Sequence, residues 1–273
     1  MKVVAAVNGL ITSEIAALYA LRYAAFHGFT LTLLHVTNPD DSWPDVEKSM
    51  VVIEEAATTY KVTAERVRLA GNPIKAISDF LAQNRVDTLF CATRRRHHLL
   101  ENSLSDHLIR LALPADLVVV QVVRLDGSHV VRNMVLPIRE DGLSVKKFTL
   151  FAGLAKAYGA EAEIYSINLV NSKKLAALDM PNTRALLRKL NDQLAHYTKL
   201  ARFMGLSLHI KHAVTRNEVD QVLHHLAHHD FQLMVIGGRR LSMLSRLFKK
   251  RPIERLFHDT PINMLAFYGR DNG

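Results

Sequence analysis

Apolar, strand-like segments alternate with amphipathic, helix-like segments along this chain of 273 residues, and the same order occurs twice. In the first half the apolar segments include KVVAAV, TLTLLHV, DTLFCAT and ADLVVVQVV, with apolar residues at helical spacing between them. Strands that are apolar on both faces need helices on both faces, which favours a parallel sheet. We therefore predict an α/β fold.

The second half repeats this order, with NMVLPI, EAEIYSI, LSLHIKHA, QLMVIGG and INMLAF in the strand places. Each half closes with a helix pattern, a proline (Pro114 or Pro261) and a final apolar strand. This self-similarity indicates a tandem duplication. The stretch RLDGSHVVRN has an Asp-Gly turn signal and no periodicity, so we place the linker there, between domains at 1–126 and 131–273.

The length of the apolar runs, the start of the chain and the cysteine count indicate which class of protein to expect. The longest apolar runs are far shorter than the ~20 residues that span a membrane, and the start of the chain lacks a secretory signal pattern. We expect a cytoplasmic protein without a membrane span. The single cysteine, Cys91, excludes an internal disulfide, and its apolar neighbours predict a buried, unreactive thiol.

The net charge of +9 resides in the second half. Residues 1–128 hold 13 basic and 14 acidic side chains, whereas residues 129–273 hold 22 and 12. This asymmetry indicates either an anionic partner or a solvated basic face. Single-stranded nucleic acid also needs stacking aromatics, and the basic run offers only Phe248 and Phe257, which fit apolar packing positions. We therefore expect no nucleic-acid partner.

A glycine turn in the second half is followed by cations. The segment VIGGRRLSMLSRLFKKRPIERL (235–256) runs from an apolar strand through Gly237-Gly238 toward a helix, as in phosphate-binding loops. Basic side chains stand where such loops keep further glycines. Three interpretations stay open: a nucleotide cradle, a grip for another anion, and the remains of a lost site.

Several spaced segments resemble the universal stress protein family in its tandem form, over almost the full chain. They are VNGLITS, AGNPIKAISDFLAQNRVDTLFCAT, NSLSDHLIRLALPADLVVV, AVTRNEVDQVLHHLAHHDFQLMVIGG and RPIERLFHDTPINMLAF. The resemblance implies two doubly wound, five-stranded parallel-sheet domains in tandem, Rossmann-like and nucleotide-binding-like. It also implies that the two halves pair through their fifth strands, that the chain forms a homodimer, and that it acts on an unidentified regulatory protein partner.

Members of this family that bind ATP carry a glycine, two residues, a glycine, nine residues, a glycine and then Ser or Thr after the fourth strand. In the second half Gly237 fits the first position, but Arg240, Lys250 and Arg251 occupy the other three. Arg239 adds a further cation. The spacing is kept and the small residues are lost.

The first half departs from the same pattern. Ala92 and Arg95 stand for the first two glycines, and the segment ends in Asn102-Ser103 after about three residues too few.

The acidic residue that ATP-binding relatives place after the first strand is matched by Asn8 and Arg139. Asn8 is able to hydrogen-bond a base or ribose, whereas Arg139 has no acceptor. Gly71, which fits the family pattern before Asn-Pro, is matched by Arg216 in the second half.

The histidine pairs of LHHLAHH, His224/His228 and His225/His229, have the spacing of zinc ligands, but no glutamate lies between them as in H-E-x-x-H. We expect surface histidines and no metal. Thr12 and Ser144 are candidate N-caps.

The resemblance, together with the lost glycine pattern, implies a non-catalytic stress-response or regulatory protein that does not bind ATP in the usual manner. One alternative is a regulatory module that binds a nucleotide or another anion through the basic cleft of the second half, and another is a weak ATPase. No resident cofactor is predicted, although ATP or another phosphorylated ligand stays open. The candidate ligand positions are Gly237, Arg239, Arg240, Lys250, Arg251, Arg139, Asn8, Arg95, Asn102 and Ser103.

Overall fold

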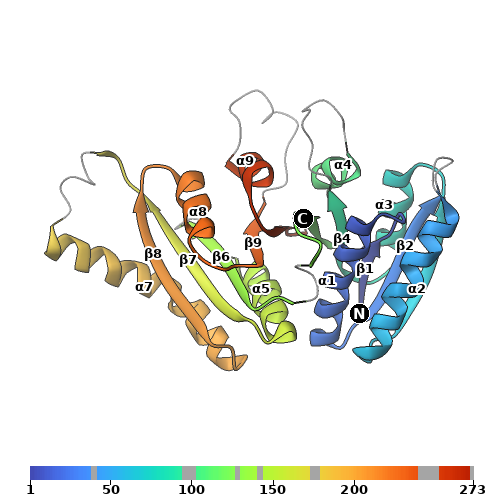
Figure 1. Cartoon of the computed structure of the whole chain (residues 1–273), viewed down its shortest axis with the longest axis horizontal. Coiled ribbons are helices and arrows are strands. Elements are labelled where there is room, and N and C mark those ends of the chain that lie inside the picture. The colour runs from blue at the N-terminus through green and yellow to red at the C-terminus, as the bar shows by residue number, and fades with distance from the viewer. Residues whose placement is uncertain are drawn as a thin grey trace.

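The computed structural model describes residues 1–37, 42–93, 103–126, 130–139, 144–172, 179–238 and 252–270, the last without the side chains of 252–254. Figure 1 shows one strongly twisted sheet with helices on both faces. No helix among these residues is long and apolar enough to cross a membrane.

The first half alternates strands and helices from the start of the chain. Its elements are β1 (Lys2–Ala6), α1 (Ile11–His27), β2 (Thr30–Thr37), α2 (Trp43–Thr59), β3 (Ala64–Ala70), α3 (Pro73–Gln83), β4 (Val86–Thr93), α4 (Leu104–Arg110) and β5 (Asp116–Gln121).

The second half repeats the alternation. Its elements are β6 (Asn133–Arg139), α5 (Val145–Tyr158), β7 (Glu161–Leu169), α7 (Met180–Phe203), β8 (Leu208–Thr215), α8 (Glu218–Ala227), β9 (Leu233–Gly237), α9 (Pro252–Asp259) and β10 (Asn263–Tyr268).

The ten strands in the described part of the chain form a single sheet, in the order β3-β2-β1-β4-β5-β10-β9-β6-β7-β8. Within each half the neighbouring strands are parallel and the order is that of a doubly wound fold. Among the described strands the only antiparallel pair joins β5 to β10, with Val119 opposite Ala266. The predicted fold class is confirmed, and so is the predicted pairing of the two fifth strands.

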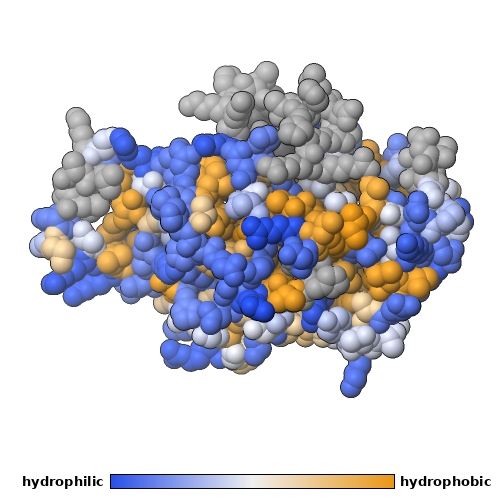
Figure 2. Space-filling view, in the orientation of Figure 1, coloured by the Kyte–Doolittle hydropathy of each residue, from blue (hydrophilic) through white to orange (hydrophobic). Residues whose placement is uncertain are grey.

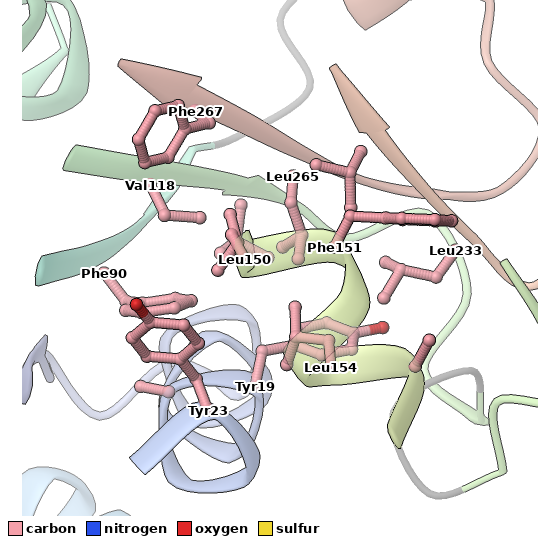
Figure 3. Close-up of a cluster of buried hydrophobic side chains, with 14 of the residues drawn as sticks. Tyr19, Tyr23, Phe90, Val118, Leu150, Phe151, Leu154, Leu233, Leu265 and Phe267 are labelled. Carbon is pink, nitrogen blue, oxygen red and sulfur yellow. The ribbon is translucent and has the colours of Figure 1, made fainter. Parts of the chain in front are cut away.

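The helices cover the sheet in two layers that extend across both halves. One core packs α1, α2, α5 and α7 against one face, and the other packs α3, α4, α8 and α9 against the opposite face. On the first face α1 and α5 meet over the central strands, where Tyr19, Phe151 and Phe267 lie in the same cluster (Figure 3). Because each core contains residues of both halves, the halves are packed as one body.

Buried polar groups also cross from one half to the other. The side chain of Asn263, at the start of β10, is fully buried, and its Nδ2 donates to Tyr19 Oη of α1 at 3.0 Å. Asp116, at the start of β5, accepts from the backbone N–H of Arg270 at 2.6 Å. The Arg270 guanidinium also lies 3.4 Å from Asp87. These bonds fix the relative position of the two halves.

The starts of α2, α5 and α1 show how each helix is capped. Helix α2 begins at Trp43, after Ser42, and its first turn accommodates Pro44 because proline has no N–H that would need an acceptor. Ser144 is confirmed as the N-cap of α5, accepting from Lys147 N. The prediction for Thr12 was wrong, since α1 starts one residue before it, with Leu10 as N-cap.

The exposed surface differs between the two halves. Hydrophilic colouring dominates the second half on the face drawn in Figure 2, and hydrophobic colouring gathers over the first half. The exposed apolar side chains of the first half include Leu10, Ile11, Val51 and Val52.

Candidate functional site

The carboxyl ends of parallel strands are where open α/β sheets bind ligands, so the candidate residues after β1, β4, β6 and β9 were expected to form a site in each half. Four of them lie in the described part of the chain: Asn8, Ser103, Arg139 and Gly237. The predicted positions Arg95, Asn102, Arg239, Arg240, Lys250 and Arg251 fall outside the described residues.

Asn8 organises the turn that leads into α1. Its Oδ1 accepts from Leu10 N at 3.2 Å, and its backbone N–H donates to Ser13 Oγ at 3.2 Å. Ser13 Oγ in turn donates to Leu10 O. The side-chain oxygen that was expected to meet a base or ribose therefore already has a structural partner.

The adjoining Gly9 brings this turn against the start of α2. Its φ of +81° lies in the region that favours glycine, and an added Cβ would lie 2.9 Å from Val46 N and 3.1 Å from Asp45 Cβ. The turn and the helix start therefore touch, and the chain itself occupies the space directly over Gly9.

An aromatic and basic stack fills the neighbouring position at the ends of β2 and β3. His35 is buried, and its Nδ1 donates to Val7 O at 2.9 Å. Its ring lies 5.9 Å from that of Trp43, and the Arg68 guanidinium lies 4.2 Å from the Trp43 ring centroid. Side chains of the chain itself therefore pack together where β1, β2 and β3 end.

Ser103 caps α4 instead of facing open space. Its Oγ accepts from Asp106 N, and the Asp106 carboxylate accepts from Ser103 N, which makes a reciprocal capping box. The hydroxyl also donates to Asp106 Oδ2 at 2.8 Å. The position that holds a phosphate-binding hydroxyl in the family pattern is thus committed to the helix start.

The glycine pair after β9 is explained by close packing. A Cβ on Gly238 would lie 2.0 Å from the Tyr268 ring, and one on Gly237 would lie 3.1 Å from Lys147 Nζ. Real side chains do not approach so closely, so glycine is required at position 238 whether or not a phosphate ever binds there.

The two described arginines among the basic candidate positions of the second half, Arg139 and Arg216, have partners on their own half. Arg139 forms an ion pair with Glu218 at 3.5 Å, and Arg216 donates to Ser172 Oγ at 3.0 Å. The Glu218 pair lowers the positive charge that Arg139 contributes at the end of β6. Among the described residues other than glycine, only Lys61 has a positive φ. Arg216 therefore does not adopt the positive φ of its counterpart Gly71.

Lys147 is a site residue that sequence reasoning missed. It is only 5% exposed, lies in the first turn of α5, and extends its ammonium toward Gly237 at the end of β9. A cation is unfavourable near the positive end of the helix dipole, so a lysine three residues after the Ser144 N-cap was the available signal. Its ammonium therefore lies beside the glycine turn.

The prediction of surface histidines was wrong for His225. Its ring is 5% exposed, stacks on Tyr165 at 3.8 Å, and shares a 2.5 Å hydrogen bond with Glu163. Burial raises the pKa of Glu163, but hydrogen bonds with His225 and Lys211 outweigh it and leave that pKa below its usual range. The reason is the face of α8, since Val222 and His225 lie three apart on its buried side.

No group of three His, Cys, Asp or Glu residues suited to a metal occurs among the described residues. Cys91 is buried as predicted, and burial raises the pKa of its thiol to about 12, which disfavours the reactive thiolate.

The first half contains the doubly wound strand order, the turn after β1 and the helix cap after β4. The same half also matches a known family at the level of sequence. Residues 1–121 match the model of the universal stress protein family. This match covers the first half of the chain. No curated protein matches the chain.

Solved structures extend the likeness of the fold to the whole chain. A universal stress protein from Archaeoglobus fulgidus is 13% identical with a TM-score of 0.62, over 99% of this chain and 98% of that one. A putative universal stress protein from Pseudomonas aeruginosa gives 11% and 0.62, over 99% and 94%. The cytoplasmic domain of a prokaryotic cation chloride cotransporter gives 11% and 0.59, over 100% and 96%. At these identities the likeness concerns the fold alone.

Proposed function

We propose that the chain is a tandem universal stress protein, with domains at 1–126 and 131–273, that acts as a non-catalytic regulatory module in the cytoplasm. It does not bind ATP in the usual manner. The family match of residues 1–121 and the repeated strand order of the second half support this assignment.

One observation carries the second part of the proposal. The turn after β1 packs against the start of α2, so that a single added carbon on Gly9 would lie 2.9 Å from Val46 N. ATP-binding members of the family that this chain resembles hold the nucleoside at this turn. In this chain Asn8 Oδ1 already accepts a hydrogen bond from Leu10 N. A nucleotide would have to displace these contacts before it made its own.

Isothermal titration of the full chain with ATP and magnesium, joined to a phosphate-release assay, tests this proposal. The expected result is no saturable heat with ATP up to about 1 mM, the range of weak ligand binding, and no phosphate release above buffer. Saturable binding would contradict the proposal, and Ser103→Ala or Lys147→Gln would then show which half holds the nucleotide.

A second candidate function is supported by Lys147. We propose as the alternative that the second half binds a phosphorylated ligand, because this nearly buried ammonium lies at the N-terminus of α5 beside the glycine turn. The probe is inorganic pyrophosphate. It should raise the melting temperature of the wild-type chain and of Lys156→Met, whose lysine lies near the far end of α5, but not that of Lys147→Met. Equal shifts in both variants would refute the alternative.

Self-association belongs to the proposal as well. The fifth strands pair within one chain, so a homodimer has to use another surface than β5 and β10. Light scattering of the purified chain decides whether the predicted homodimer forms.

A further inference from the structure

An open cavity lies at the junction of the two halves, at the opposite end of the strands from the candidate site. Its volume is about 440 Å³, within the size range of small-molecule sites. Arg22 of α1 lines it from the first half, and Tyr158 and Gly159 at the end of α5 line it from the second. The starts of β6 and β7 complete it with Arg132 and Glu161.

Arg22 is held rigidly at this junction. Its guanidinium lies 3.9 Å from the Tyr60 ring centroid and 4.6 Å from that of Tyr158. It also donates to Ala157 O, near the end of α5, at 3.2 Å. A planar guanidinium fixed between two rings loses little conformational freedom on binding an anion.

The side chains of Arg132 and Glu161 add one positive and one negative charge to the lining of the cavity. Within the described residues neither side chain has an ion pair or hydrogen bond, although their backbones are joined by a 2.8 Å bond from Glu161 N to Arg132 O. With Arg22 they give the cavity two guanidinium groups against one carboxylate. The lining is therefore net positive.

Apart from Asn133, the remaining wall is apolar or open. Val130, Val131 and the Tyr158 ring provide apolar surface. Gly159 ends α5 with a left-handed φ of +65°, and no atom lies within 4 Å of the place that a Cβ would take. A flat apolar group fits against these residues while its charge faces the arginines.

We propose that this junction cavity binds a small organic anion, with its carboxylate or phosphate on Arg22 and Arg132 and its apolar body against Tyr158. Because the site needs residues of both halves, its occupation stabilises their packed arrangement, and the ligand connects metabolite level to the state of the whole chain.

The test uses phenyl phosphate and benzoate as probes, with benzyl alcohol as the neutral analogue, in two-dimensional NMR spectra of the full ¹⁵N-labelled chain. The anions should shift the amides of Tyr158, Gly159 and Glu161 saturably, and the tighter of the two identifies phosphate or carboxylate as the preferred group. Benzyl alcohol should leave those amides unshifted.

Variants separate this cavity from the carboxyl-end site. Arg132→Glu should weaken the anion by roughly tenfold, which corresponds to ~1.4 kcal/mol, and Arg132→Gln by less. Arg216→Glu, at the other end of the strands, should leave the affinity unchanged. The proposal is overturned if neither anion shifts the junction amides, if benzyl alcohol binds equally well, or if Arg216→Glu weakens binding as much as Arg132→Glu. The last result would place the anion at the carboxyl ends.

Discussion

Asn263 offers the sharpest test that the two halves are one folding unit. Its Oδ1 accepts from Val123 N at 2.8 Å and Arg124 N at 2.9 Å, and its Nδ2 donates to Tyr19 Oη at 3.0 Å and Arg124 O at 2.9 Å. One fully buried amide thus satisfies two backbone donors and a carbonyl of the connection after β5, and a hydroxyl of α1.

Asn263→Ala removes all four bonds at once. An unsatisfied buried polar group costs about 1–3 kcal/mol, and part of the exposed backbone regains water, so we expect a loss of about 2–4 kcal/mol. Asn191→Ala, which removes one bond between an exposed asparagine and His212, is the matched control and should cost less than about 0.5 kcal/mol.

The assay is equilibrium unfolding in urea, followed by circular dichroism and by tyrosine fluorescence. Both signals should report one transition in the wild type, and Asn263→Ala should shift that whole transition. Two separate transitions, of which only one moves, would refute the reasoning that a shared core and these bonds unite the halves.

Three further predictions concern single side chains. Burial lowers the pKa of His27, although the nearby Asp87 opposes this, and its buried Nε2 has no hydrogen-bond partner among the described residues. The unfolded state therefore binds more protons as the pH falls below ~6.5. Stability should decline there, and His27→Leu should flatten the dependence of the urea midpoint on pH. Gly238→Ala should cost about 1–3 kcal/mol by overpacking against Tyr268, whereas Gly269→Ala, with 3.8 Å to its nearest neighbour, should be tolerated. Cys91 should resist iodoacetamide in the folded chain and react at the rate of unfolding, and rapid labelling under native conditions would contradict its burial.

Much of the fold is legible in the sequence because it depends on local patterns. Apolar runs such as ADLVVVQVV mark strands covered on both faces, and their repetition led to two doubly wound halves. The pairing of β5 with β10 came from the family resemblance, and it has a physical reason in the apolar residues on both strands.

The candidate site was harder to predict from the sequence because its arrangement depends on contacts between distant segments. The role of Asn8 as a turn-forming side chain is local. The contact of Gly9 with Val46, in contrast, joins the turn before α1 to the start of α2. The burial of His225 on α8 depends on Glu163 of strand β7, although a glutamate within the apolar run EAEIYSI was a signal for a buried partner. Spacing alone does not reveal such pairs.

We propose above that packing of the chain's own residues takes the place of a nucleotide at the carboxyl ends of the strands. Native mass spectrometry of the full chain, purified gently from its own host, tests it most directly. The account predicts the mass of the chain without an adenine nucleotide, unchanged when ATP and magnesium are added. A bound adenine nucleotide, released on denaturation and identified by its mass, would contradict it.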